Sequence, residues 1–283
     1  MKLLSVSDLA RVSFPDRERP GLMAMLECYF DDSGTHDASP VVTWGGLVGT
    51  KDQWEFLDRR WRALLVEPLQ GEASPPKPSL RQFHLSHCAA LDGEFESYSR
   101  AESDRLRYLF RQIIADSGVE SYAYSVSTRD YDGLVKGKLR KQWGSANRMA
   151  AVGCITRALV RANERREQFV SVMMDRGAIT DEIGELMRHV ERRYEGETTL
   201  VSLGSMPVVN LTPLQAADTI ATESFWSAKK IICNDDREHS AHLKSMLGKV
   251  ELIRGFIMER KHVKGAIRAT NQRPWINGRI RIE

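Results

Sequence analysis

Residues 23–34 read MAMLECYFDDSG, an apolar run that ends in two aspartates, a serine and a glycine. The run is apolar on both sides except at Glu27, which is typical of a central strand in a sheet. Asp, Ser and Gly are common in turns, so the sequence DDSG leads us to expect that the strand ends near Asp31. A carboxylate in that position lies at the sheet edge where open α/β sheets place ligands. Asp31 is therefore the first candidate site residue.

The segments around this strand predict a mixed sheet with helices packed on it. Strands cluster early in the chain and then alternate with helices, which indicates a mixed α/β fold. The further strands are expected at residues 41–48, 82–85, 120–128, 169–174 and 200–209. Helices are expected at residues 52–65, 101–116, 145–166, 179–194, 212–228 and 239–260. The helix at 212 has the clearest start, because Thr212 can cap it, Pro213 suits its first turn and Gln215 completes a capping box.

Two more aspartates stand in positions like that of Asp31. Asp175 directly follows the compact apolar run 169–174, and Asp218 shares an otherwise apolar helix face with Leu214. If their strands are parallel neighbours, Asp31 and Asp175 converge and repel each other unless a proton or a cation separates them. A lone carboxylate on an apolar helix face is costly to bury unless it is paired or bound to a metal. The alternative for each aspartate taken alone is an ordinary turn or surface role.

Carboxylates are suitable ligands for hard cations such as Mg²⁺ and Mn²⁺. Two such ions, about 4 Å apart, activate water and stabilise the leaving oxygen in phosphodiester hydrolysis. The aspartate triple therefore predicts a metal site with the chemistry of a hydrolase.

Four segments resemble motifs of the bacterial family called domain of unknown function 3800. Residues 28–34 (CYFDDSG) resemble its Tyr-x-Asp-Glu-Ser-Gly strand end, and residues 82–84 (QFH) resemble its Glu-Phe-His element. Residues 172–176 (VMMDR) resemble its middle Asp-bearing strand, and residues 213–218 (PLQAAD) resemble its late Leu-Gln-x-Ala-Asp helix. The order and approximate spacing agree, and the match covers roughly residues 23–230.

That family looks like a member of the ribonuclease H-like superfamily. The resemblance implies a mixed sheet of three antiparallel strands and then parallel strands, flanked by helices. It implies that Asp31, Asp175 and Asp218 are the catalytic and metal-binding residues of a nuclease that uses one or two Mg²⁺ or Mn²⁺ ions. The motif's glutamate is Asp32 in this chain. We expect supporting roles around the metal for a further set of residues: Asp32, Ser33, His84 and Gln215.

Two other classes of protein remain open. Residues 30–35 (FDDSGT) are similar to the opening Asp-x-Asp-Gly-Thr motif of haloacid dehalogenase-like phosphatases, in which Asp31 would be the covalent nucleophile. Ser33, however, replaces the second aspartate, the usual general acid of that motif. The remaining alternative is a non-catalytic nucleic-acid-binding module with the same fold and a degenerate site.

Basic residues gather in two places although the net charge is only +3. The first group holds Lys136, Lys138, Arg140 and Lys141. The second is the segment 260–282, which contains seven Lys or Arg and no acid. Its candidate substrate contacts are Arg268, Arg273, Trp275 and Arg279. Cations bind phosphates and an aromatic ring stacks on a base, so both groups predict a nucleic acid partner. The alternative is a solubilising surface.

The chain of 283 residues is expected to form an N-terminal arm (1–22), the main domain (23–230) and a C-terminal helix with a basic tail (231–283). No apolar run approaches the roughly 20 residues that span a bilayer, so no membrane partner is expected. The start lacks the apolar core of a secretory signal. Four scattered cysteines without a CxxC pair fit a reducing compartment, which predicts a cytoplasmic protein.

Overall fold

The computed structural model describes residues 25–36, 38–69, 71, 76–166, 169–175, 199–233 and 253–272. Within these ranges the strands are β1 (Met25–Ser33), β2 (Val41–Gly49), β3 (Glu120–Ser127), β4 (Phe169–Asp175), β5 (Thr199–Met206) and β6 (Ile253–Met258). The α-helices are α2 (Lys51–Val66), α3 (Leu85–Ala90), α4 (Arg100–Ser117), α5 (Thr128–Leu134), α6 (Gly137–Trp143), α7 (Ala146–Glu164), α9 (Thr212–Ile232) and α11 (Arg260–Gln272). Two 3₁₀ turns are η1 (Gly93–Phe95) and η2 (Val208–Asn210).

The described strands form one mixed sheet in the order β5-β4-β1-β2-β3-β6. β1, β2 and β3 are successive antiparallel neighbours, β4 pairs parallel with β1, and β5 pairs parallel with β4. β6 pairs parallel with β3. Because β2 alone runs against the others, the carboxyl ends of the other five strands lie at one edge, which we call the carboxyl edge. The expectation of a mixed α/β sheet flanked by helices is confirmed.

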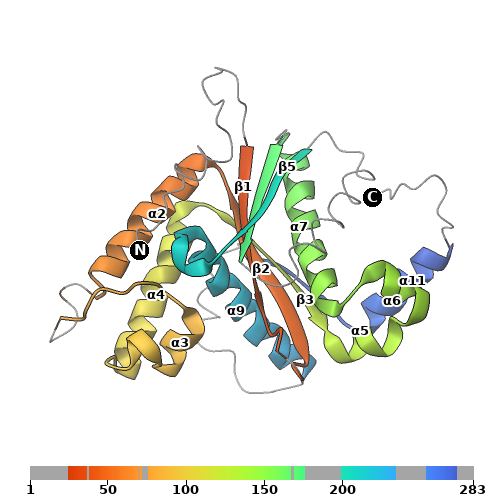
Figure 1. Cartoon of the computed structure of the whole chain (residues 1–283), viewed down its shortest axis with the longest axis horizontal. Coiled ribbons are helices and arrows are strands. Elements are labelled where there is room, and N and C mark those ends of the chain that lie inside the picture. Colours follow the sequence, from red (N-terminus) through yellow and green to blue (C-terminus); the bar gives the residue numbers. More distant parts are fainter. Residues whose placement is uncertain are drawn as a thin grey trace.

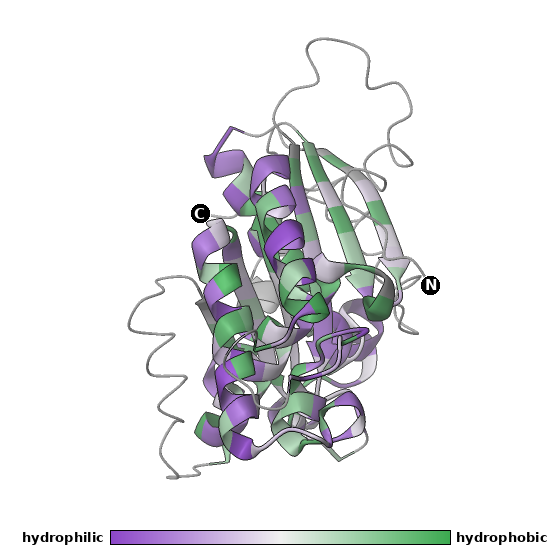
Figure 2. Ribbon diagram, turned by 90° about the vertical axis from the view of Figure 1, so that its left-hand side faces the viewer, coloured by the Kyte–Doolittle hydropathy of each residue, from purple (hydrophilic) through white to green (hydrophobic). Residues whose placement is uncertain are grey.

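Helices cover both faces of this sheet (Figure 1). α9, α2 and α4 lie over one face, and α7 lies over the other. The side chains of β1 alternate between two cores, because Tyr29 packs with the α2 and α4 side and Phe30 packs with the α7 side. Viewed from the side of α2 and α4, purple and green alternate along the helices, as expected where only one stripe of each helix is buried (Figure 2).

The structure corrects the sequence expectations in three regions. β1 continues through Ser33, so Asp31 lies inside the strand rather than at its end. Residues 82–84 are extended but belong to no strand, and α3 follows them directly. Residues 253–258, expected in a helix over 239–260, form β6 instead. The basic segment that follows begins as α11 rather than as a tail. The arm 1–22, the helix expected at 179–194 and the end of the tail from 273 lie outside the described residues.

The prediction that α9 begins at residue 212 is confirmed, but the predicted N-cap residue is wrong. Leu211 is the N-cap residue, and Thr212 is the first helical residue with Pro213 after it. The Thr212 hydroxyl donates to the Asp58 carboxylate on α2 instead of capping the helix. Gln215 is engaged elsewhere, so no capping box forms there.

α9 lies unusually close to the sheet because β2 contains a glycine beneath it. A Cβ atom added at Gly45 would lie 2.5 Å from Ala221 Cα and 2.6 Å from Ala221 N, which are both backbone atoms of α9. Gly45 pairs with Asp31 on β1, and Ala221 lies one turn after Asp218. The glycine therefore sets the separation between the strand and the helix that carry two of the candidate aspartates.

We therefore expect Gly45→Ala to lower the free energy of unfolding by about 1–3 kcal/mol, because the helix backbone must shift to admit the methyl group. Gly133→Ala on α5 is the matched control, since nothing lies within 4 Å of the added Cβ atom. Urea unfolding measures both variants. Equal stability of Gly45→Ala and wild type would show that α9 does not depend on this close approach.

Among the described residues, no helix is both long and apolar enough to cross a membrane. All four cysteines are free thiols, three of them buried and Cys233 exposed.

Candidate active site

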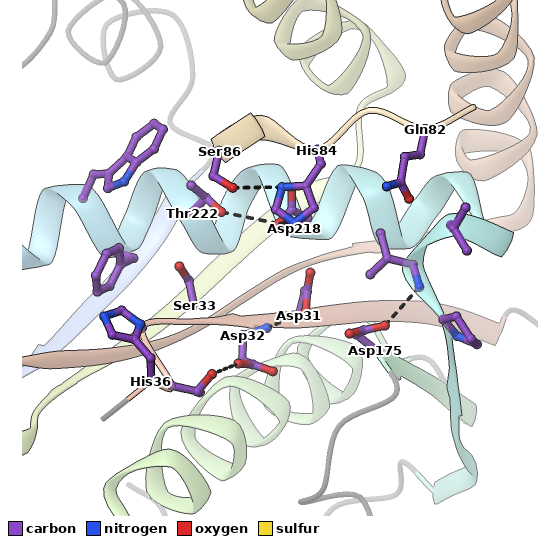
Figure 3. A pocket seen from close by; sticks show the side chains of 17 residues that line it. Asp31, Asp32, Ser33, His36, Gln82, His84, Ser86, Asp175, Asp218 and Thr222 are labelled. Atoms are coloured by element: carbon purple, nitrogen blue, oxygen red, sulfur yellow. Dashed lines mark hydrogen bonds and ion pairs between the residues drawn. The ribbon is translucent and has the colours of Figure 1, made fainter. Parts of the chain in front are cut away.

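A cavity of about 700 Å³ opens at the carboxyl edge of the sheet, between β1 and α9 (Figure 3). Five stretches of chain form its walls: the end of β1 with the turn after it, residues 82–86, the end of β4, residues 207–209 and the middle of α9. The lining residues are Asp31, Asp32, Ser33, Gly34, Thr35, His36, Gln82, His84, Ser86, Asp175, Pro207, Val208, Val209, Asp218, Thr222, Phe225 and Trp226.

The three aspartates singled out in the sequence all line this cavity. β1 and β4 are parallel and pair Phe30 with Met174, so the next residue on each strand is Asp31 and Asp175. Asp218 projects from α9 above them, and Figure 3 shows Asp31 between Asp175 and Asp218. Three elements that are distant in sequence thus bring three carboxylates to one place.

Hydrogen bonds fix these carboxylates in different ways. Asp175 accepts from the backbone N–H of Val208 at 3.0 Å. Asp218 accepts from the backbone N–H of Leu85 at 3.1 Å and from the Thr222 hydroxyl at 3.4 Å. These contacts hold Asp175 and Asp218 by groups on the cavity wall.

Asp31 and Asp32 are neighbours on β1 but have different surroundings. One oxygen of Asp31 accepts from the backbone N–H of Asp32 at 2.8 Å, and the side chain is only 6% exposed. The Asp32 carboxylate accepts from the Thr35 hydroxyl at 2.7 Å, in the turn that follows the strand. Asp31 is therefore buried in the acidic group, as Asp218 is, while Asp32 is tied to the turn.

Burial and mutual repulsion disfavour the ionised form of these carboxyls. Burial is the main cause that raises the pKa of Asp31 well above its ordinary value, and the charges of Asp218, Asp32 and Asp175 raise it further. Burial also raises the pKa of Asp218, against the opposing effects of His84 and the Leu85 hydrogen bond. It raises the pKa of Asp32 as well, with Asp175 adding to the effect. A proton or a cation relieves this repulsion.

The observed groups fit a hard divalent cation. Among the described residues that line the cavity there are four aspartates and no Lys or Arg, so no side chain there carries a permanent positive charge. Carboxylate oxygens are the donors that Mg²⁺ and Mn²⁺ prefer. In the described part of the chain, no three His, Cys, Asp or Glu side chains already stand in position to hold one ion. Side-chain rotation must therefore accompany coordination by all three aspartates.

His84 lies beside Asp218, on the same side of the cavity as α9 (Figure 3). Its Nε2 atom lies 3.8 Å from Asp218 Oδ1, and its Nδ1 atom is hydrogen-bonded to the Ser86 hydroxyl at 3.0 Å. The ring also stacks on His87 at 4.5 Å between centroids. These contacts fix the imidazole at the entrance, where it can contact a substrate.

Gln215 supports the site without lining it. Its side-chain oxygen accepts from Trp61 Nε1 and from the Phe83 backbone N–H, both at 3.0 Å. The bond to Phe83 fixes the extended segment that presents His84 and the Leu85 N–H to the cavity. Gln215 thus contacts the segment that carries His84, and its supporting role around a metal stays a prediction.

Glu223 is turned away from the acidic group, as its offset of five residues from Asp218 predicts. It is 2% exposed and forms an ion pair with Arg111 of α4, which is 5% exposed. Burial lowers the pKa of Arg111 to about 10. Glu223 therefore joins α9 to α4 and lies apart from the three aspartates.

The basic residues predicted to bind substrate lie outside the cavity. Lys136 precedes α6, Lys138, Arg140 and Lys141 lie on it, and Arg268 lies on α11. The other predicted contacts, Arg273, Trp275 and Arg279, lie outside the described residues.

Several lining residues were not identified from the sequence. Thr222 is four residues after Asp218 and so shares its helix face, and Ser86 is two residues after His84; both spacings could have indicated them. The backbone N–H of Val208 and the exposed His36 gave no such signal, because tertiary structure alone places them at the cavity.

Comparison with known proteins found no family model that matches this chain and no curated protein that is similar to it. The fold and cavity define the class only coarsely, as a mixed α/β protein with an acidic site at the carboxyl edge of its sheet. The resemblance to the family called domain of unknown function 3800 remains a prediction from four motifs.

Repulsion in the metal-free site predicts a pH-dependent stability. Asp31→Asn should raise the free energy of unfolding in EDTA at about pH 7, because the amide removes a buried charge that the neighbouring aspartates repel. Wild type has the raised pKa in the folded state, so it loses stability as the pH rises above the unfolded pKa of about 4. The difference between the two proteins should vanish below that pH.

Urea unfolding between about pH 3 and pH 8 measures this difference. Asp116→Asn, an exposed substitution on α4, controls for the loss of one negative charge. A variant at Asp31 that is less stable than wild type at neutral pH would show that the Asp31 charge stabilises the fold.

Proposed function

We propose that this protein is a divalent-metal-dependent nuclease with a ribonuclease H-like domain, which hydrolyses phosphodiester bonds in DNA or RNA. The observation that carries the proposal is the convergence of Asp31, Asp175 and Asp218 on a cavity without a described Lys or Arg in its lining. The strand pattern is consistent with it, because three antiparallel strands precede two strands parallel to the first. This is the pattern that the motif resemblance implies.

In this proposal Asp31, Asp175 and Asp218 hold Mg²⁺ or Mn²⁺. When bound, the ions supply activation of water and neutralisation of charge on the phosphate. Asp32 and Ser33 border the same site, and the Thr35 hydroxyl orients Asp32.

The remaining wall residues position the substrate. His84, fixed by Ser86 and close to Asp218, offers a hydrogen bond at the entrance. Val208, Val209 and the partly buried Trp226 form an apolar wall that limits access of bulk water. The protein's own contribution is thus to orient the substrate beside the aspartates.

The test is cleavage by the purified protein of single- and double-stranded DNA and RNA. Cleavage is expected with Mg²⁺ or Mn²⁺, and EDTA should stop it. Asp175→Asn should remove the activity, while Asp116→Asn on α4 should retain it. Equal cleavage by Asp175→Asn and wild type would point to a contaminating nuclease and would refute the proposal.

The same purified protein can be used to distinguish the nuclease from the phosphatase alternative. A phosphatase of that class would release phosphate from a small phosphomonoester and form a covalent aspartyl-phosphate on Asp31. A nuclease that works through metal ions alone forms no such adduct. A trapped adduct on the peptide that contains Asp31, seen by mass spectrometry, would replace the nuclease proposal with the phosphatase.

A further inference from the structure

Three helices at the carboxyl edge carry exposed cations that form no ion pair with any residue in the described part of the chain. α5 and α6 follow β3, and α11 follows β6, so all of them begin at the edge that also holds the acidic cavity. α11 contacts α5, and the three helices lie together in Figure 1. We define the α5–α6–α11 basic surface by its exposed cations: Arg129, Lys136, Lys138, Lys141, Lys264 and Arg268.

The acidic residues next to this surface are already engaged. Asp130 pairs with Arg260, Asp132 pairs with Arg140, and Glu259 pairs with Lys261. No ion pair joins any of the six cations of the surface to another described residue. Counting only the described residues, the surface therefore carries an excess of positive charge, although the net charge of the whole chain is only +3.

The apolar sides of these helices are buried in the core. Val135 and Val263 are fully or almost fully buried there, and Leu139, Trp143 and Ile267 pack against the same core. Among the described residues, no large exposed hydrophobic side chain lies on α5, α6 or α11. A surface with charge but no apolar side chains to insert favours a polyanion over a lipid bilayer.

The turn between β1 and β2 connects this surface to the cavity. Gly34, Thr35 and His36 of the turn line the cavity. Later in the same turn, the backbone O atom of Ser39 accepts from the Thr128 hydroxyl, at the start of α5. Arg129 therefore directly follows the residue of α5 that contacts this turn.

We propose that the α5–α6–α11 basic surface binds the phosphate backbone of a polynucleotide whose scissile bond lies in the acidic cavity. This inference rests on the proposed nuclease function. β1 and β6 are three strand spacings apart, which is roughly 14 Å at about 4.8 Å per spacing. At about 3.4 Å per nucleotide the substrate extends at least about four nucleotides from the cleaved bond on this side. Mononucleotides and very short oligonucleotides are therefore poor substrates.

The test measures binding in EDTA, where no cleavage occurs, by fluorescence anisotropy with oligonucleotides of about 20 and about 3 nucleotides. The variant K136Q/K138Q/K141Q should bind the longer oligonucleotide on the order of 100-fold more weakly at about 0.1 M salt. Its slope of log affinity against log salt should fall by about 2–3, since each lost phosphate contact removes roughly 0.7–0.9. The short oligonucleotide should bind weakly to all the proteins.

The matched control removes three charges from α2, as K51Q/R59Q/R60Q. These residues are exposed on a helix that begins at the opposite edge of the sheet. This control should bind within about twofold of wild type with an unchanged salt slope. An unchanged salt slope and affinity in K136Q/K138Q/K141Q would overturn the inference. Binding to anionic vesicles is measured in parallel. If this variant loses binding to the vesicles but not to the oligonucleotide, the inference is also overturned.

Failure of the inference and failure of the nuclease proposal have different signatures. If wild type cleaves and the K136Q/K138Q/K141Q variant retains affinity and salt slope, the surface assignment is wrong and the nuclease stands. If the variant loses oligonucleotide binding while wild type cleaves nothing, the surface binds nucleic acid and the nuclease proposal is wrong.

Discussion

Asn in place of Asp31 is expected to lower the rate of metal-dependent cleavage by at least roughly 100- to 1000-fold, the usual effect of losing one group that stabilises transition-state charge. Asp31 is one of the two buried members of the acidic group, 6% exposed and next to Asp32, Asp175 and Asp218. An amide is a neutral and poor ligand for a hard cation, so the substitution removes ion binding. The Asn side-chain oxygen can still accept from the Asp32 N–H.

Single-turnover cleavage in saturating Mn²⁺ measures this rate, because it excludes product release. Asp116→Asn, which removes an exposed carboxylate of α4, should keep the wild-type rate. Cleavage by Asp31→Asn within a few-fold of wild type would mean that Asp31 binds no catalytic ion.

The second large effect concerns the buried ion pair of Arg111 and Glu223, which joins α4 to α9. Arg111→Met should lower the free energy of unfolding by about 3–5 kcal/mol, because it leaves a buried Glu223 charge without its partner. The double variant Arg111→Met/Glu223→Leu should recover most of this loss, since apolar residues of similar size replace both charges.

Denaturant unfolding measures these two variants beside Lys51→Met. Lys51 forms an exposed ion pair with Glu55 on α2, and its loss should change stability by no more than about 1 kcal/mol. If Arg111→Met lowered the free energy of unfolding by a similarly small amount, Glu223 would not be held as a buried charge. Because α9 also carries Asp218, we expect Arg111→Met to lower the rate of metal-dependent cleavage as well.

Local sequence was sufficient to predict the central strand and to select the candidate aspartates. β1 is apolar on both sides, and the structure places Leu26 and Phe30 in one core and Tyr29 in the other. Asp31 and Asp175 follow apolar runs, and because β1 and β4 are parallel neighbours both side chains reach one edge. Asp218 was indicated by its position on an apolar helix face, and the motif resemblance implied that it would join them.

Long-range contacts explain the errors. In residues 253–258 the apolar positions Ile253, Phe256 and Ile257 fit helical spacing, but pairing with β3 makes this segment a strand. Capture of Gln215 by Trp61 and Phe83 likewise replaces the capping box that the local sequence favours. Neither effect can be derived from a local window.

The same limitation applies to the α5–α6–α11 basic surface. The sequence indicated basic residues at 136–141 and from 260 onward as separate groups. Only the sheet order, with β3 beside β6, brings α5, α6 and α11 to the same edge as the acidic cavity. The position of these three helices relative to the candidate active site is therefore a property of the fold.

Titration of Mn²⁺ into the metal-free protein, followed by calorimetry, tests most directly whether the aspartates form a metal site. Wild type should bind one or two ions with saturation, and Asp31→Asn should lose at least one of them. Asp116→Asn should bind as wild type does. Absence of Mn²⁺ binding in wild type, or the same stoichiometry and affinity in Asp31→Asn, would contradict a metal site at Asp31, Asp175 and Asp218.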